Sequence, residues 1–230
     1  EEVRGWGIFD FDVATYNVVI NSYASERDLV GASTWFQKIY EAGLKPSLIS
    51  YSTIFKVCTS TKRGDLAKEY LGRLVSEADL HPNLITLNHA IQALAMSRPH
   101  LGDARELLET MEDRFGVAPN ATAYNFLLRA AGEKGDARLA MELYHRMKRV
   151  DGLVPEPRTI WEATIACTKC RFFAPMEELA DDLMALSADA PEGEDVPQQQ
   201  LQQQQQQGGV RYMGREGGRE GGRGQGQGQG

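Results

Sequence analysis

Four small polar residues recur at a nearly constant interval, and their types suit hydrogen-bonding chemistry. Asn17, Ser52, Asn88 and Asn125 lie 35, 36 and 37 residues apart, and each directly follows a larger apolar residue. Amide and hydroxyl groups donate and accept hydrogen bonds over a short reach and carry no charge. A row of such groups, one per interval, predicts a surface that contacts a ligand at regular points.

A second polar row precedes the first. Ser47, Asn83 and Asn120 each follow a proline, and Ser and Asn are favoured residues for capping the start of a helix. Capping alone could therefore account for this second row. The first row lies five places further on, inside the predicted helices, where Asn and Ser are indifferent helix formers. Because helix formation does not explain the first row, we favour a binding role for it.

The other residues that could do chemistry form no catalytic constellation. Cys167 and Cys170 make a lone C-x-x-C pair, whereas zinc would need two further ligands and a redox site would need a thioredoxin-like βαβ context. We expect both to be buried or surface thiols on a helix. The histidines are isolated from one another and from any nucleophile pattern: His81, His89, His100 and His145. We expect no enzymatic activity, no cofactor and no metal.

The elements that must position the polar rows are pairs of amphipathic helices. After each large anchor residue, apolar residues recur with the i, i+3, i+4, i+7 spacing of a helix, as in Tyr51, Ile54, Phe55 and Cys58. The anchors are Tyr16, Tyr51, Leu87, Tyr124 and Trp161. A second stripe begins at Ala32, Ala67, Ala104, Ala140 and Met176. Breaks such as Lys134-Gly135-Asp136 separate the two helices, and proline-containing turns follow the second, so each interval is a helical hairpin.

One hairpin cannot bury its apolar stripes alone, but stacked hairpins bury them against their neighbours. The sequence therefore predicts an all-α protein, an α-solenoid of 35 to 37 residue repeats with a concave surface. Residues 1–12 form the remnant of a preceding repeat or a linker. The repeats span 13–47, 48–83, 84–120 and 121–157, a partial fifth repeat spans 158–186, and a tail spans 187–230.

Composition limits the classes of function. The net charge is −7, which argues against tight non-specific binding to nucleic acid but leaves room for a local basic groove. No run of 18 apolar residues occurs, so we expect no membrane-spanning helix. The tail is rich in Gln and Gly and poor in large apolar residues, so we expect it to be disordered. Its Arg-Gly segments could bind nucleic acid flexibly, but the interleaved Glu216 and Glu220 favour an inert linker.

The repeat interval and the segment "VATYNVVI" strongly resemble the pentatricopeptide repeat. The matching tripeptides are Thr15-Tyr16-Asn17, Ser50-Tyr51-Ser52, Thr86-Leu87-Asn88 and Ala123-Tyr124-Asn125. The tetratricopeptide repeat would place a Trp and a Leu-Gly in its first helix, and neither occurs in register. The resemblance covers residues 13 to about 186, and the fifth unit departs from it because Trp161-Glu162 replaces Tyr-Asn.

This resemblance implies a function for the polar rows. Pentatricopeptide repeats bind single-stranded RNA, one base per repeat, through the fifth and last residues of each unit. Carried over, Asn17 with Ser47 resembles a cytosine reader, Ser52 with Asn83 an adenine reader, and Asn88 with Asn120 a pyrimidine reader. Asn125 also suggests a pyrimidine, but its partner stays open because Pro155-Glu156-Pro157 interrupts the register. Glu162 fits no usual reader, so the fifth unit receives no base. The implied site is 5′-C-A-Y-Y-3′.

Phosphate contacts would come from basic residues on the first helices, although surface solubility also explains such residues. The candidates are Lys56, Lys62, Arg63, Arg98, Arg129, Lys134, Lys169 and Arg171. The resemblance implies RNA processing, stability, editing or translation in a mitochondrion or chloroplast. This chain shows no targeting signal and begins with Glu1, so we expect a fragment of a longer array.

Two alternatives stay open. One is a helical scaffold that binds a protein or peptide in the same groove, which the acidic net charge favours. The other is the recognition arm of an enzyme, such as a protein-only RNase P or an editing factor, whose catalytic domain lies outside this chain. The sequence leaves the oligomeric state undefined.

Overall fold

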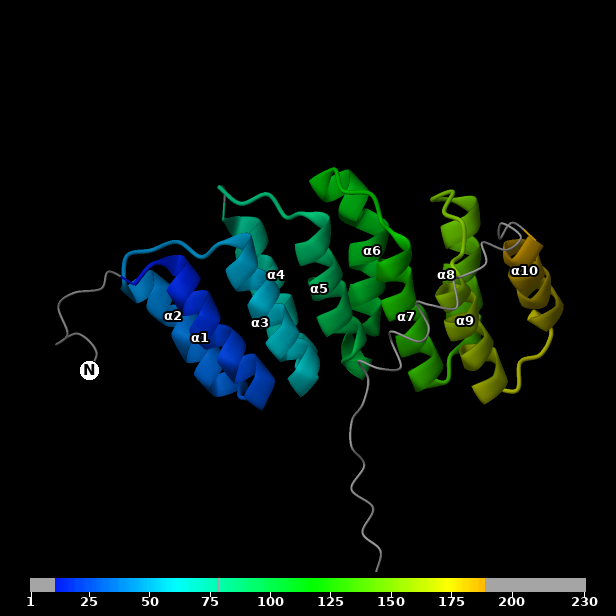
Figure 1. Cartoon of the computed structure of the whole chain (residues 1–230), viewed down its shortest axis with the longest axis horizontal. Helices are drawn as coiled ribbons and strands as arrows, with labels where there is room; N and C mark the ends of the chain where they lie inside the picture. The colour runs from blue at the N-terminus through cyan, green and yellow to red at the C-terminus, as the bar shows by residue number, and fades with distance from the viewer. Residues whose placement is uncertain (1–10, 78, 189–230) are drawn as a thin grey trace, which may run out of the picture. The chain divides into compact units, whose positions relative to one another are not determined.

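The computed structural model describes residues 11–77 and 79–188. Within these ranges the chain forms ten α-helices and one short 3-10 helix (Figure 1). Their bounds are α1 Val13–Glu26, α2 Leu29–Glu41, α3 Leu48–Thr61, α4 Gly64–Ser76, α5 Leu84–Ala95, η2 Arg98–His100, α6 Leu101–Phe115, α7 Ala121–Lys134, α8 Ala137–Arg149, α9 Pro157–Lys169 and α10 Met176–Ala188. Most of the predicted remnant 1–12 and nearly all of the predicted tail 187–230 lie outside the described residues.

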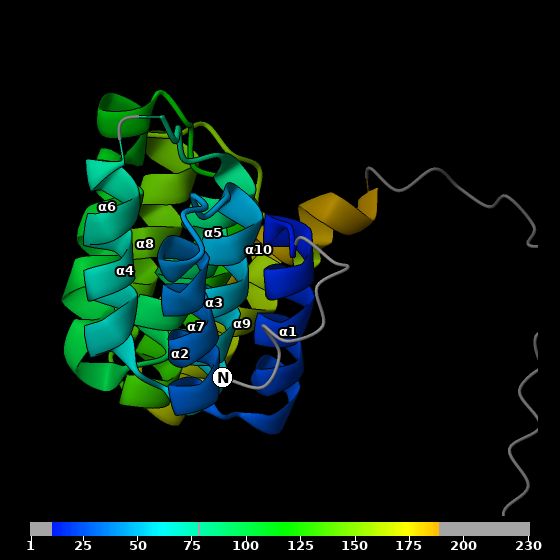
Figure 2. The same ribbon diagram turned by 90° about the vertical axis from the view of Figure 1, so that its left-hand side faces the viewer.

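The helices form hairpins that stack side by side. Each odd-numbered helix packs against the next odd-numbered helix and against the even-numbered helix that follows it. Figure 2 shows the two layers that result, with α4, α6 and α8 in one and α3, α5, α7 and α9 in the other. The predicted α-solenoid is confirmed. The first three predicted repeats each enclose one helix pair, while the predicted fourth repeat ends at residue 157, where α9 has already begun.

Side-chain hydrogen bonds cap the first turns of α1, α3, α5 and α7. Ser47, Asn83 and Asn120 precede α3, α5 and α7, and each accepts a hydrogen bond from the backbone N–H three residues later. These bonds satisfy a donor that the first turn of a helix leaves unpaired, so the predicted capping role is confirmed. Asp12 caps α1 in the same way. The preceding turn prolines are all buried: Pro46, Pro82, Pro119 and Pro155.

The core lies between the two layers and follows the predicted stripes. Tyr51, Phe55 and Tyr124 are fully buried. Small residues allow close approach of the second helices, since Ala32, Ala67, Ala104 and Ala140 are also fully buried. Tyr16 is only half-buried, because α1 has a first-helix neighbour on one side among the described residues, and its ring packs against Trp35 with 6.0 Å between centroids. Burial of these stripes supplies most of the stabilising free energy of such a stack.

The structure corrects the register of the fifth unit. The alignment by side-chain size made Trp161 the equivalent of Tyr124, but Trp161 is 64% exposed while Ile160 is 2% exposed. The buried Pro155 takes the place of the earlier turn prolines, and Glu156 precedes α9 as Asn120 precedes α7. The anchor of the fifth unit is therefore Ile160, and the register runs through Pro155-Glu156-Pro157 without interruption. The anchor assignment to Trp161 was wrong by one residue.

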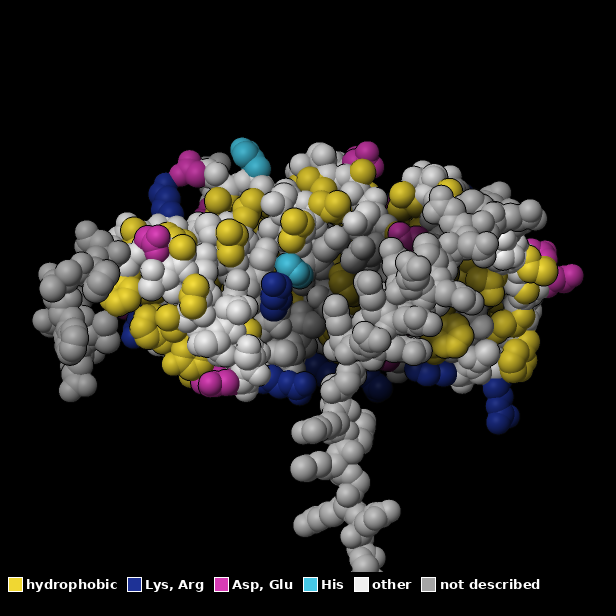
Figure 3. All heavy atoms as spheres, in the orientation of Figure 1, with side chains coloured by type: hydrophobic (Ala, Val, Ile, Leu, Met, Phe, Trp, Pro, Cys, Tyr) yellow, Lys and Arg dark blue, Asp and Glu magenta, His cyan; other side chains and the backbone are white. Residues whose placement is uncertain are grey.

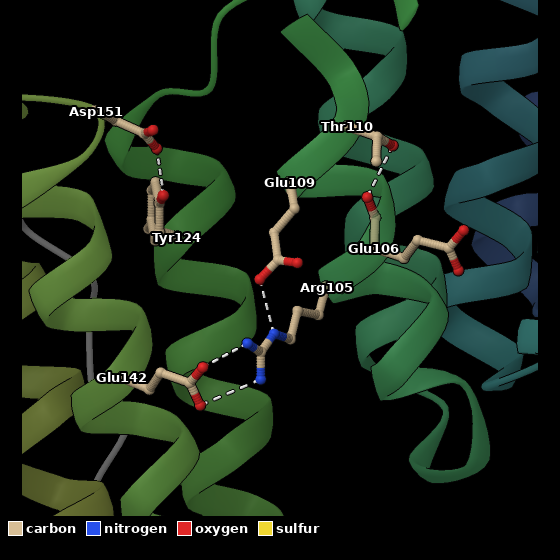
Figure 4. Close-up of polar contacts among 7 residues, drawn as sticks. All are labelled: Arg105, Glu106, Glu109, Thr110, Tyr124, Glu142 and Asp151. Atoms are coloured by element: carbon tan, nitrogen blue, oxygen red, sulfur yellow. Dashed lines mark hydrogen bonds and ion pairs between the residues drawn. The ribbon is translucent and has the colours of Figure 1, made fainter. Parts of the chain in front are cut away.

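Ion pairs link successive even-numbered helices. Lys68 on α4 contacts Asp103 on α6 at 2.6 Å, and Lys148 on α8 contacts Asp182 on α10 at 2.6 Å. Arg105 on α6 makes a similar link to Glu142 on α8, while its Nε also donates to Glu109 at 2.8 Å (Figure 4). Because these side chains are partly or fully exposed to solvent, each pair contributes little to stability. The pairs connect neighbouring units across the layer of even-numbered helices.

Candidate nucleic-acid interface

The structure brings two of the predicted residue pairs into contact. The side-chain amide of Asn17 on α1 donates to Ser47 Oγ at 3.5 Å, and that of Asn88 on α5 donates to Asn120 Oδ1 at 3.3 Å. The contact arises because each odd-numbered helix packs beside the next, so the residue five places after one cap faces the cap of the following helix. We call this place on each odd-numbered helix the cap+5 position.

The second pair is bridged by a residue that sequence reasoning did not single out. Ser52 Oγ lies 3.2 Å from Thr86 Oγ1, and Thr86 Oγ1 donates to Asn83 Oδ1 at 2.9 Å. Thr86 is 1% exposed, and its hydroxyl therefore links Ser52 to Asn83 through two hydrogen bonds. A hydroxyl residue three places after the cap was the available signal, since Thr15, Ser50, Thr86 and Thr159 share this place and only Ala123 departs from it.

The structure shows which residue of the next unit is equivalent to the earlier partners of the cap+5 row. Glu156 stands at the cap of α9, the place that Ser47, Asn83 and Asn120 hold in the earlier units. The Glu156 side chain makes no capping hydrogen bond. Unlike the side chains of Ser47, Asn83 and Asn120, this carboxylate forms no hydrogen bond with the first turn of the helix that it precedes.

Three amide oxygens at cap+5 positions lack a hydrogen-bond donor within the part of the chain that the structure describes. The Oδ1 atoms of Asn17, Asn88 and Asn125 are buried and accept no hydrogen bond from any described residue. A buried acceptor without a partner costs about 1–3 kcal/mol, and such groups are rare in folded proteins. The three oxygens recur at equivalent positions, so the packing of the odd-numbered helices leaves one amide oxygen unsatisfied by the described residues in each of these three units.

Exposed aliphatic side chains border the cap+5 row. Val18 follows Asn17 and is 72% exposed, while Ile49 and Ile85 lie three residues before Ser52 and Asn88 and are 66% and 64% exposed. All three belong to the odd-numbered helices, which form the face turned toward the viewer in Figures 1 and 3. The face therefore combines polar groups with apolar surface that could cover a flat ring.

The predicted phosphate contacts divide into two groups. Arg63 donates to Asp65 through Nε at 2.8 Å and Nη2 at 2.6 Å, and Arg129 Nε lies 3.2 Å from Glu133. The other six are exposed and form no ion pair with a described acidic residue: Lys56, Lys62, Arg98, Lys134, Lys169 and Arg171. Figure 3 shows Lys and Arg side chains gathered along the lower edge of the face. Only the second group has charge available for a phosphate.

His89, which sequence reasoning set aside, lies next to Asn88 on α5. Burial lowers the pKa of His89, and the nearby Lys56 ammonium lowers it further. The imidazole is therefore neutral at pH 7. Its Nδ1 is buried and bonds to no described residue, which adds one more unmet polar group beside the row.

The cysteines and acidic residues provide no second site in the described ranges. Cys58 and Cys167 are buried and Cys170 is half-buried, and burial raises the pKa of the Cys167 thiol. Between residues 11 and 188, leaving out residue 78, no three His, Cys, Asp or Glu side chains come together in a way that could hold a metal ion. None of the helices described is both long and apolar enough to cross a bilayer.

Comparison with known sequences assigns the family. Residues 12–60 match the PPR repeat family, and residues 71–134 and 106–156 match the pentatricopeptide repeat domain. These matches cover more than half of the chain. The chain belongs to the pentatricopeptide repeat family.

The curated relatives are distant and much longer. A mitochondrial pentatricopeptide repeat-containing protein of Arabidopsis thaliana is 25% identical over 172 residues, which cover 75% of this chain and 23% of the relative. A chloroplastic one from the same plant is 22% identical over 136 residues, which cover 59% of this chain and 17% of the relative. The chain thus spans about a fifth of the length of the curated relatives it matches.

Solved structures of the family share the fold. The pentatricopeptide repeat protein PPR10, solved in complex with an 18-nt psaJ RNA element, superposes with a TM-score of 0.68 at 20% identity and covers 79% of this chain and 26% of PPR10. The PPR domain of Arabidopsis thaliana protein-only RNase P 1, solved in complex with tRNA, gives a TM-score of 0.61 at 17% identity and covers 84% of this chain and 98% of that domain.

Proposed function

We propose that this chain binds single-stranded RNA, one base per repeat, with the cap+5 residue and the following cap residue contacting the edge of each base. The observation that carries this proposal is the pairing of Asn17 with Ser47 and of Asn88 with Asn120, with the amide oxygen of each Asn left unbonded. Two proteins of the same fold are solved with RNA, PPR10 with a psaJ element and the RNase P domain with tRNA.

The chemistry of the pairs supports the site 5′-C-A-Y-Y-3′. An amide whose N–H is engaged by the cap residue keeps its oxygen unpaired as an acceptor, and cytosine offers an amino donor from N4. In the second unit the Ser52 hydroxyl, linked through Thr86 to Asn83, replaces the amide, so a different base is expected there. In the fourth unit the Glu156 carboxylate only accepts, which favours a base whose edge donates.

The exposed aliphatic side chains and free lysines complete the proposed interface. Val18, Ile49 and Ile85 offer apolar surface for the faces of unstacked bases. Lys56, Lys62 and Lys134 supply positive charge for the phosphates. This local charge is needed because the chain as a whole is acidic, with a net charge of −7. RNA binding is therefore local, confined to one face of an acidic protein.

The biological setting follows from the relatives. They include mitochondrial and chloroplastic proteins, so we place this chain in RNA processing, stability, editing or translation within one of these organelles. The RNase P neighbour shows that such a domain can serve as the RNA-binding arm of an enzyme. The chain would then provide recognition, and the rest of a longer protein would provide catalysis.

A protein-binding scaffold is the second candidate. The exposed Val18, Ile49 and Ile85 favour it, because exposed apolar side chains gathered on one face also suit a peptide. Salt distinguishes the two functions, since RNA binding through phosphates weakens steeply as salt rises. A peptide held by apolar contacts would not follow that dependence.

Selection of bound RNAs from a randomised pool by the purified chain tests the proposal. We expect enrichment of cytosine, adenine and two pyrimidines in that order. Asn88→Ala should remove the preference at the third position and leave the first two intact. Failure to enrich adenine at the second position would contradict the site, and failure to retain any RNA at low salt would contradict the function.

A further inference from the structure

Trp161 stands at the cap+5 position of α9. Glu156 precedes α9, and Trp161 follows five residues later, just as Asn125 follows Asn120 on α7. The corrected register therefore places an indole where the preceding units carry an amide or a hydroxyl. The earlier assignment of Glu162 to this place is replaced by the assignment of Trp161.

The fold does not need the Trp161 side chain. Ile160, Ala163 and Cys167 fill the core beneath α9 and are at most 2% exposed, whereas Trp161 is 64% exposed. Trp is a residue that proteins bury to a large extent. No odd-numbered helix follows α9 among the described residues, so the indole is exposed at the cap+5 position and open to a ligand.

Unmet polar groups also occur at the junction of α7 and α9. Asn125 Oδ1 on α7 and Thr159 Oγ1 on α9 are both buried, and neither bonds to a described residue. Thr86, the equivalent of Thr159 two units earlier, bonds to both Ser52 and Asn83. The junction of α7 and α9 thus keeps hydrogen-bonding capacity that the junction of α3 and α5 has satisfied internally.

We propose that Trp161 stacks on the base that follows the four bases of the read site, so the chain contacts five nucleotides. This inference rests on the proposed RNA binding. An indole has one N–H donor and no acceptor, so it cannot test a base edge as an amide does. Stacking on an aromatic ring is tolerant of sequence because every base has a π face. The fifth nucleotide is therefore held without being selected.

The test compares two RNAs on the full chain by fluorescence anisotropy. One is the RNA selected by the wild-type protein, and the other is the same RNA with an abasic riboside at the nucleotide 3′ of the four-base site. For the wild type, loss of the base should weaken binding about 5- to 150-fold, the range expected for one aromatic stack. Trp161→Ala should bind both RNAs equally, at the weaker level, and Trp161→Phe should keep part of the discrimination.

A control separates this inference from the proposed function. Asn88→Ala should still discriminate against the abasic RNA while losing its base preference at the third position. A purely structural role of Trp161 would make Trp161→Ala weaken both RNAs by the same factor, and that result would overturn the inference. The inference is also wrong if Trp161→Ala discriminates against the abasic RNA as strongly as the wild type does. If Asn88→Ala still loses the base preference at the third position in that case, the proposed RNA binding stands. If the wild type retains no RNA, both proposals fall.

Discussion

The Asn120 side chain joins two functions in one oxygen atom. Its Oδ1 accepts the backbone N–H of Ala123 at 3.1 Å, which caps α7, and it also accepts the side-chain amide of Asn88 on α5 at 3.3 Å. Helix initiation in one unit and the orientation of the contact residue in the preceding unit therefore depend on the same group. This arrangement follows from the stacking of odd-numbered helices, which sets each cap beside the cap+5 position of its neighbour.

The two roles of Asn120 can be separated by choice of substitution. Asn120→Ser keeps a good cap and recreates the Asn–Ser pair of Asn17 and Ser47, so the third base preference should shift toward cytosine with little change in stability. Asn120→Ala removes the cap and should lower the free energy of unfolding by about 1 kcal/mol. Urea unfolding and RNA selection on both variants measure the two effects. If both substitutions destabilised the protein equally, the difference in capping between Ser and Ala would have no effect on stability, and the prediction would be wrong.

The salt dependence of RNA binding should identify the phosphate contacts. Replacing Lys56, Lys62 or Lys134 by Gln should reduce the slope of log affinity against log salt by about 0.7 for each lost phosphate contact. Arg63→Gln and Arg129→Gln should change the slope less, because Asp65 and Glu133 already neutralise these guanidinium groups. Titrations of one RNA at several salt concentrations provide the slopes. A larger change for the paired arginines than for the lysines would contradict the assignment.

Two glycines on α4 should respond in opposite directions to the same change. A Cβ on Gly64 would lie 2.5 Å from Ser97 Cβ and 2.7 Å from His100 Cδ2, so Gly64→Ala should destabilise the fold by about 1–3 kcal/mol. Gly72 is exposed, and a Cβ at this position would have no heavy atom within 4 Å. Gly72→Ala should therefore stabilise the fold by about 0.5–1 kcal/mol. Urea unfolding measures both. A neutral Gly64→Ala would indicate that η2 can shift away from α4.

The link between Lys68 and Asp103 should contribute to stability only above acidic pH. Hydrogen bonds from Lys68 at 2.6 Å and from His100 at 2.7 Å lower the pKa of Asp103 from its ordinary value of 3.8. Because the folded-state pKa lies below the unfolded value, this stabilisation is present above about pH 4 and is lost as the pH falls through the folded-state pKa. Asp103→Asn should therefore flatten the loss of stability as the pH falls from about 4 through that folded-state pKa.

Urea unfolding at a series of pH values measures this effect. Asp113→Asn is the matched control, because Asp113 is an exposed residue of the same helix and forms no ion pair with a described residue. The two variants should differ above about pH 4, where only Asp103→Asn has lost this stabilisation, and should converge as the pH falls through the folded-state pKa of Asp103. Parallel stability curves for Asp103→Asn and the wild type would show that the carboxylate makes no pH-dependent contribution.

The repeat architecture could be predicted because its signals are local and periodic. Caps such as Ser47 act within one turn of one helix, and stripes such as that from Tyr51 to Cys58 repeat with the geometry of a helix. The contact of Asn88 with Asn120 was also predictable in outline, since units of equal length stack with equal offsets. Thr86 could not be predicted as a bridge, because whether two hydroxyls meet depends on how closely two helices pack.

The sequence alone determined the helical pairs, their interval and the two polar rows, because each depends on neighbours within one unit. Tertiary structure decided which large residue of the fifth unit enters the core: Ile160 fits beneath α9 and leaves Trp161 outside. Side-chain size could not decide this, since burial depends on the helix that packs opposite. Tertiary structure also placed Glu156 at the cap that faces α7 and left Lys134 without an acidic partner among the described residues. Such relationships depend on distances between units, which no single repeat contains.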